Sequence, residues 1–416
     1  MKNKKAITLL LIANAVSSFA QGISMLAIPW TLVNARNEEA FFGASVLIIT
    51  IVSLFWSPYA GTLIDRYPRK NIFYGLCVVG FVLLAFSGSY GVVTGYAPSM
   101  LCVIVFAFTM LNFNLHYPTL YSFTQEMADR SNYSKVNSLL EIQGQSTNIL
   151  SGAFGTVLLS GLAPDSLSWL GVSLPFTMKP WTIEEIFIMD ALTYAISFAL
   201  IATIRYKRIA ELKVDTGSLK DRFAKGLSYL KEHKPILYFG SFSYLVFVFV
   251  LIHEYYLVHL YVSNNLMAGG HILAISLVSF TSGALTAGFS ARHILKYTTA
   301  IHGVSAFMLI AGTVAYSMAF TINAAPFFLL SFILGLTNSS IRIMRVTFLF
   351  ENIPNSTIGR TTSIFQMFNI SSRILLVSIF ALPFFVEDVT RAYLVCGSVI
   401  VLGAIPIFLL RKRFTA

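Results

Sequence analysis

Long apolar runs follow one another along the whole chain, separated by short polar segments. A helix needs roughly 20 apolar residues to cross the hydrocarbon layer of a bilayer, and each run reaches that length. We predict twelve membrane-spanning helices, at about residues 6–33, 41–64, 71–94, 98–119, 136–162, 183–204, 235–261, 270–291, 297–320, 325–348, 358–384 and 388–410. The pattern therefore predicts an all-α membrane protein.

The twelve predicted spans divide into two sets of six. A long polar segment, 205–234, separates them and is expected to be a partly helical cytoplasmic linker. This division predicts an amino-terminal six-helix bundle at 1–204 and a carboxy-terminal one at 235–416. Polar positions repeat between the halves at an offset of 226 residues, which indicates homologous, pseudo-symmetric bundles. The matched positions are Asn112, His116 and Gln125 with Asn338, Arg342 and Glu351.

Composition and charge support a membrane location. The chain is 56% hydrophobic and only 11% charged, with a net charge of +11, whereas soluble domains carry roughly 25% charged residues. The basic residues lie in short loops between apolar runs, so they do not indicate nucleic-acid binding. Of the 29 Lys and Arg residues, 25 fall on the face that holds the amino terminus. The positive-inside rule therefore predicts a multi-pass membrane protein with both termini cytoplasmic.

The loop between the second and third spans carries a motif. Gly61, Asp65, Arg66, Arg69 and Lys70 form the pattern Gly-x-Leu-x-Asp-Arg-x-x-Arg-Lys. At the end of a second span, this pattern resembles the loop motif of the major facilitator superfamily, whose members are secondary transporters with twelve membrane helices. The resemblance implies two six-helix bundles around a central cavity, and a monomer.

The same resemblance implies that the loop gates the cytoplasmic side. Asp65 is expected to accept hydrogen bonds from the positive, amino-terminal end of the eleventh span, and Arg69 to pair with acidic residues after the fourth. The expected partners are Gly359 and Arg360 for Asp65, and Glu126 and Asp129 for Arg69. An alternative is that the charges of the loop merely fix the membrane topology, and it applies chiefly to Arg66 and Lys70.

Polar residues recur inside the spans, where they are costly and usually face the bundle interior or water. Glu141, Gln145 and Asn148 share one face of the fifth span, and Gln366, Asn369 and Arg373 share the matching face of the eleventh. The resemblance implies that the first, fourth, seventh and tenth spans and their neighbours line the cavity. We assign to the substrate cavity Gln21, Asn112, His116, Gln145, Asn148, Arg342, Arg345, Gln366, Asn369 and Arg373.

These assignments have alternatives. Asn, Gln and His in membrane helices often only bond a neighbouring helix, and Arg342 and Arg345 lie near enough to the cytoplasmic end to reach it. Arg373 is different, because it lies about 22 Å into its span at 1.5 Å per residue. It requires a counter-charge, a water-filled cavity or an anionic substrate.

Two carboxyl groups are candidates for proton coupling. Glu254 lies on the outer half of the seventh span, where partial desolvation brings a carboxyl group towards the working pH range. Glu141 is the second candidate. The alternatives are an inert rim residue for Glu254 and a structural ion-pair partner for Glu141.

Several patches narrow the resemblance to one bacterial branch. Residues 137–139, 152–155, 190–194 and 358–360 look like those of macrolide-efflux and siderophore-export proteins. No phosphate-binding loop or zinc-protease motif is present, so we expect no enzyme, no cofactor and no metal. The resemblance implies a location in the bacterial inner (plasma) membrane, and the leading hypothesis is proton-coupled export of a small organic solute, drug-like or siderophore-like. Alternatives are proton-coupled uptake of an anionic solute, such as a siderophore, and a non-transporting membrane sensor or assembly factor.

Overall fold

The computed structural model describes residues 3–161, 176–205, 219–267 and 270–409. Part of the predicted linker, residues 206–218, lies outside the described residues. The first half consists of α1 (Lys4–Pro29), which continues as a π-helix (Trp30–Ala35), then α2 (Glu39–Arg66), α3 (Arg69–Thr94), α4 (Ser99–Met127), α5 (Tyr133–Ser160) and α6 (Ile183–Thr203).

The second half repeats this order with one interrupted helix. Its first span is built from α8 (Lys234–Ser243), α9 (Leu245–Ile252), a π-helix (His253–Leu257) and α10 (Val258–Asn264). The others are α11 (Gly270–Ile294), α12 (Ala300–Phe320), α13 (Ala324–Asn352), α14 (Ile358–Phe380) and α16 (Thr390–Leu409), with the short α15 (Pro383–Val386) before the last. Both halves thus carry a π-helix in the later part of their first span.

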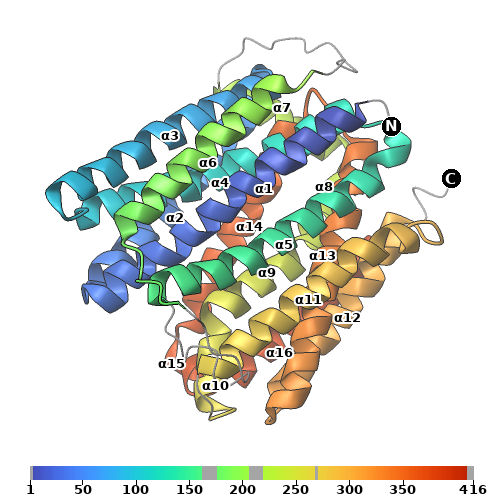
Figure 1. Ribbon diagram of the computed structural model, residues 1–416. Coiled ribbons are helices and arrows are strands. Elements are labelled where there is room, and N and C mark those ends of the chain that lie inside the picture. The colour runs from blue at the N-terminus through green and yellow to red at the C-terminus, as the bar shows by residue number, and fades with distance from the viewer. Residues whose placement is uncertain (1–2, 162–175, 206–218, 268–269, 410–416) are drawn as a thin grey trace.

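Each half has its own apolar core. One buried cluster runs from Ala6 to Ile204 and the other from Leu230 to Ile407. The halves meet where α2 packs on α14 and α5 packs on α11 and α13. In Figure 1 the blue-to-green helices and the yellow-to-orange helices lie close together near the amino terminus and diverge away from it. The fold is therefore two six-helix bundles joined towards one end.

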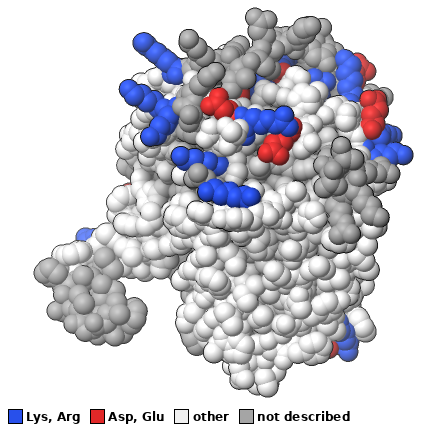
Figure 2. Space-filling model, turned by 90° about the vertical axis from the view of Figure 1, so that its right-hand side faces the viewer, with Lys and Arg blue, Asp and Glu red and all other residues white. Residues whose placement is uncertain are grey.

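Within the part of the chain that the structure describes, ten helical segments are long and apolar enough to cross a membrane. The remaining two spans, α5 and α11, pack on each other between the halves. α5 is more polar, and α11 contains a shorter apolar stretch, Ile275–Ala291. Figure 2 shows Lys and Arg gathered towards one end of the molecule, with a broad uncharged band beneath them. The described residues thus form twelve spans of a multi-pass membrane protein. We call the end that carries the 61–70 loop the basic face.

Two helices extend further than the sequence predicts. The predicted fourth and tenth spans end at residues 119 and 348, but α4 continues to Met127 and α13 to Asn352. Apolar content did not reveal these last turns because they are polar, and their polar groups bond the other half. Glu126 is consequently part of α4 and does not follow it.

One helix of the linker lies outside the two bundles. α7 (Leu219–Glu232) packs against α2 and α14. A Cβ atom added to Gly226 would lie 3.0 Å from Cβ of Arg360, so the two backbones approach closely. The Tyr229 hydroxyl donates to the Asn352 carbonyl oxygen over 3.4 Å. α7 therefore covers the start of α14 at the basic face.

The tight packing of α11 on α13 gives a stability prediction. A Cβ atom at Gly335 would overlap the backbone carbonyl oxygen of Phe280, which cannot move aside as a side chain can. Overpacking costs about 1–3 kcal/mol, so we expect Gly335→Ala to lower the thermal unfolding temperature of the purified protein by roughly 2 °C or more. Gly75→Ala is the control, because a Cβ there meets nothing within 4 Å. Equal unfolding temperatures for the two variants would contradict this packing.

Candidate functional site

The two halves approach most closely where α2 crosses the start of α14. A Cβ atom at Gly61 would overlap the Ser363 side chain, and one at Gly359 would lie 2.7 Å from the Gly61 carbonyl oxygen. Two glycines facing each other thus let the helix backbones touch. The Ser57 hydroxyl adds a hydrogen bond of 3.3 Å to the Ser363 carbonyl oxygen.

This close approach places the carboxylate of Asp65 at the amino terminus of α14. Its Oδ1 accepts from the Gly359 backbone N–H and its Oδ2 from the Arg360 N–H, each over 3.0 Å. Arg360 Nε also donates to Oδ2 over 2.8 Å. The first backbone N–H groups of a helix have no partner within the helix, and the helix dipole there favours an anion. Asp65, only 4% exposed, therefore caps a helix of the opposite half.

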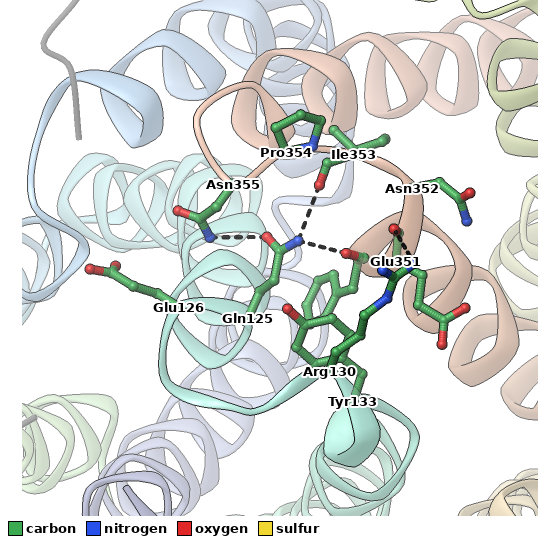
Figure 3. A pocket seen from close by; sticks show the side chains of 10 residues that line it. Gln125, Glu126, Arg130, Tyr133, Glu351, Asn352, Ile353, Pro354 and Asn355 are labelled. Carbon is green, nitrogen blue, oxygen red and sulfur yellow. Dashed lines mark hydrogen bonds between the residues drawn. The ribbon is translucent and has the colours of Figure 1, made fainter. Parts of the chain in front are cut away.

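A second set of bonds joins the last turn of α4 to the end of α13 and to the loop that follows α13. Gln125 Nε2 donates to the carbonyl oxygens of Phe350 and Ile353, over 3.0 and 3.2 Å, and its Oε1 accepts from Asn355 over 3.0 Å. Figure 3 shows Gln125 between these partners, with Arg130 reaching the Glu351 carbonyl oxygen beside them. These residues line a cavity of about 350 Å³ at the basic face.

The three basic residues of the motif differ in which half they contact. Arg69 is fully buried, and its Nη2 donates to the Asn355 carbonyl oxygen across the halves over 2.9 Å. Lys70 instead donates to the Ala202 and Ile204 carbonyl oxygens at the end of α6, within its own half. Arg66 is exposed and lies over the ring of Tyr67.

Of the two acidic partners expected for Arg69, Glu126 is buried in the last turn of α4 and lines the cavity at the basic face. Asp129 is half-buried in the loop that follows. Both residues therefore lie in the part of the first half that faces the loop after α13.

Further contacts join α5 to α13. Asn137 Nδ2 donates to Thr347 Oγ1 over 3.0 Å, and Ser339 donates to Glu141 Oε1 over 2.6 Å. Arg342 Nε lies 3.4 Å from Glu141 Oε2. On the other side of the interface, Gln366 donates to Asn114 Oδ1 over 3.1 Å. The hydrogen bonds between the halves described so far all lie in the membrane half next to the basic face.

Beyond these contacts, the same helix faces point into the space between the halves. Asn148 lies two turns past Glu141 on α5, and Arg373 lies two turns past Gln366 on α14. Residues seven apart share a helical face, so both are directed towards the opposite half. Asn148 is exposed and Arg373 half-buried. Tyr117, near the middle of the long α4, is also 39% exposed.

A cluster of charged groups lies at the outer limit of the contacts between the halves. The side chain of Arg342 is 26% exposed and interacts electrostatically with Glu141, Tyr117 and Glu254. Glu254 lies in the π-helix of the seventh span, an irregular turn of a kind that is frequent at functional sites. The cluster thus combines one partly exposed arginine side chain with two carboxyl groups, from α5, α13 and the seventh span.

Several residues expected in the cavity lie elsewhere. Gln21 and Asn112 are buried inside the first half, where both amides donate to the Tyr194 hydroxyl. His116 bonds Asn14 over 2.7 Å in the same interior. Their neighbours are the other helices of the first half, which helical periodicity alone cannot distinguish from a cavity.

The remaining cavity candidates are also buried. Arg345 donates to the Ser243 carbonyl oxygen at the break between α8 and α9, and its guanidinium carbon lies 3.7 Å from the Tyr244 ring centroid. Gln145 donates to Glu141 over 2.9 Å. Asn369 is 1% exposed, and its Oδ1 has no hydrogen-bond partner among the described residues.

Sequence reasoning missed several residues that bridge the halves. Asn355 follows the tenth span in a loop, so no helical stripe marks it. Asn114 and Asn137 are ordinary polar residues of α4 and α5, and Ser339 is one of many serines in spans. The offset of 226 residues aligns Gln125 with Glu351, which was the one signal that the ends of α4 and α13 correspond.

A comparison with known protein families assigns the chain to a family. The family model described as Major Facilitator Superfamily matches residues 10–377. The chain belongs to the major facilitator superfamily. No curated protein matches the chain. Solved structures of other superfamily transporters share the fold at low sequence identity.

A bacterial homologue of the iron transporter ferroportin, in an outward-facing state, superposes with a TM-score of 0.74 at 16% identity, covering 98% of this chain and all of that one. The human organic anion transporter TETRAN gives 0.68 at 11% identity, over 98% and 100% of the two chains. The fucose:proton symporter of E. coli gives 0.66 at 16% identity, over 100% of both. Identities this low establish the shared fold alone.

The capping of α14 by Asp65 generates a prediction about closure of the basic face. Asp65→Asn keeps the shape but removes the charge that Arg360 and the helix terminus require. Breaking a buried ion pair costs about 3 kcal/mol or more, so the closed arrangement should lose population. Spin labels are attached to cysteines that replace the exposed Lys135 and Lys296, one at the basic end of each half. Double electron–electron resonance should then show an additional, longer distance between them.

Arg66→Gln is the matched control for this measurement. Arg66 neighbours Asp65 but is exposed, and its charge lies over a ring of its own loop. Its distance distribution should match that of the unsubstituted protein. If Asp65→Asn also leaves the distribution unchanged, the cap does not hold the halves together.

Proposed function

We propose that this protein is a secondary active transporter that works by alternating access, with its basic face in the cytoplasm. The excess of Lys and Arg at that face supports the orientation through the positive-inside rule. The conformation is then closed to the cytoplasm and outward-facing. The observation that carries the proposal is the position of the contacts: the bonds between the halves lie in the cytoplasmic half, and Arg342, Asn148 and Arg373 lie at or beyond their outer limit.

We propose a small anionic solute as the cargo. Arg342 presents a partly exposed side chain near the middle of α13, and Arg373 lies further out on a face directed at the opposite half. An arginine there is costly unless it has a partner or a water-filled cavity, and guanidinium groups bind carboxylates in a two-pronged geometry. A carboxylate-bearing solute such as a siderophore fits both arginines.

Glu141 provides a route for proton coupling. Its carboxyl group accepts from Ser339 of the opposite half and lies beside Arg342, so its negative charge supports closure. Protonation removes that charge, weakens the contact between the halves and frees Arg342 for an anion. Glu254 acts on the same guanidinium group and can bind a proton in the same way.

This linkage also decides the direction of transport that we favour. If protonation frees Arg342, the proton and the anion bind together, and an inward proton gradient drives uptake. Export is the second candidate, favoured by the two carboxyl groups of the cluster. A cationic, drug-like compound would compete with protons for Glu141 and Glu254, which couples proton entry to export. A non-transporting sensor needs neither this cluster nor the buried cap at Asp65.

Transport in proteoliposomes tests these alternatives through the sign of proton movement. A panel of carboxylate chelators and cationic hydrophobic drugs is added outside vesicles under an imposed pH gradient, while solute and proton fluxes are followed. We expect an anion to enter with protons and to make the external medium more alkaline. Proton movement opposite to a cationic drug would establish export instead. Movement of no compound in either direction would contradict the transporter proposal.

Arg342→Gln should reduce anion transport roughly tenfold or more, because it removes a charge-assisted bond worth about 1.5–3 kcal/mol. Arg391→Gln is the control, since Arg391 is a half-buried residue paired with Asp388 near the start of α16, away from the cluster. In Glu141→Gln, which mimics the protonated carboxyl group, anion exchange should persist while its response to the pH gradient is lost. Full coupling in that variant would remove Glu141 from the mechanism.

A further inference from the structure

A third carboxyl group lies in the membrane, away from the cluster described above. Asp190 is on α6, about 10 Å along the helix from its start at Ile183. Its side chain is 1% exposed and points at α1. Oδ2 is 2.6 Å from the Ser24 hydroxyl, and Oδ1 is 3.4 Å from the Thr193 hydroxyl. The carboxyl group therefore lies between two helices of the first half, with hydroxyl groups as its partners.

The groups around Asp190 supply no positive charge. α6 packs against α1 and α3. α1 contributes Ser24 and Gln21, α3 contributes Cys77, and Tyr194 follows one turn along α6. Of these only Cys77 and Tyr194 can titrate, and both are neutral at ordinary pH. Among the described residues, no Lys, Arg or His acts on the Asp190 carboxyl group.

A buried carboxylate without a cation loses its hydration and gains little in return, so the neutral acid is the form that such a site favours. The partners suit a change of protonation. A hydroxyl group both donates and accepts, so Ser24 can donate to the carboxylate or accept from the acid without moving. An arginine partner, as at Asp65, only donates hydrogen bonds and carries a positive charge, so it favours the charged form.

We propose that Asp190 is a proton-binding site of the first half, separate from Glu141 and Glu254, and that it holds a proton in this conformation. The polar residues of α1 continue from it towards the basic face. Gln21 bonds Tyr194, and Asn14, two turns further, bonds His116. Asp190 thus lies at the outer end of a row of hydrogen-bonded polar residues inside the first bundle. The proposal concerns the resting protein and does not depend on cargo or direction.

Infrared spectroscopy of the full chain in lipid vesicles tests this site without a transport assay. At neutral pH the unsubstituted protein should show the C=O stretch of a protonated, buried carboxyl group, and Asp190→Asn should lack it. Glu184→Gln is the control. Glu184 is also a buried acid of α6, but it accepts the Ala97 backbone N–H over 2.8 Å. That variant should keep the band.

Ser24→Ala adds a second readout, because it removes the nearest partner and leaves the carboxyl group in place. The band should shift in frequency and persist. An identical carboxyl region in the unsubstituted protein and Asp190→Asn would overturn the proposal. If Asp190→Asn does not fold, Ser24→Ala decides: a shifted band supports the site, and an unshifted or absent band contradicts it.

Discussion

The carboxylate of Asp65 at the start of α14 is the interaction on which closure of the basic face depends. It satisfies two backbone N–H groups and one guanidinium group of the opposite half, in a place where water is excluded. An anion at a helix amino terminus is favoured by the dipole, and burial strengthens that attraction. The contact forms only because Gly61 and Gly359 let the backbones meet. Asp65, Gly61 and Gly359 therefore act as one unit, and the bonds of Gln125, Asn355 and Arg69 extend it across the same face.

The two contacts between the halves are chemically unequal. Where α11 meets α5, Gly288 lies against the Ile142 side chain. Gly288 corresponds to Gly61 at an offset of 227 residues, but Arg292 stands where the first half has Asp65. The repeat has thus kept the close approach and lost the acid that caps the facing helix. A charged helix cap therefore lies beside the close approach of α2 to α14, whereas an apolar side chain, Ile142, lies against Gly288 where α11 approaches α5.

The sequence predicted the twelve spans and the two halves because bilayer length and basic loops leave strong, local patterns. It placed Asp65 beside the start of the eleventh span only through the resemblance to a family, since nothing in the loop itself names a partner 294 positions away. Helical faces were a weaker guide. Asn148 and Arg373 lie on faces directed between the halves, whereas the equally polar Gln21 and Asn112 lie inside the first bundle. A helical stripe shows which residues share a face, and only tertiary packing shows what that face meets.

The central claim, closure at a cytoplasmic basic face with an opening on the other side, can be tested by thiol accessibility in intact cells. The native cysteines Cys77, Cys102 and Cys396 are buried, so they should react little with the thiol reagent. A cysteine replacing Asn148 should react with a membrane-impermeant thiol reagent added outside, because that position lies beyond the contacts between the halves. A cysteine replacing Gln125, within those contacts, should be protected. Protection of position 148 together with reaction at position 125 would contradict the account.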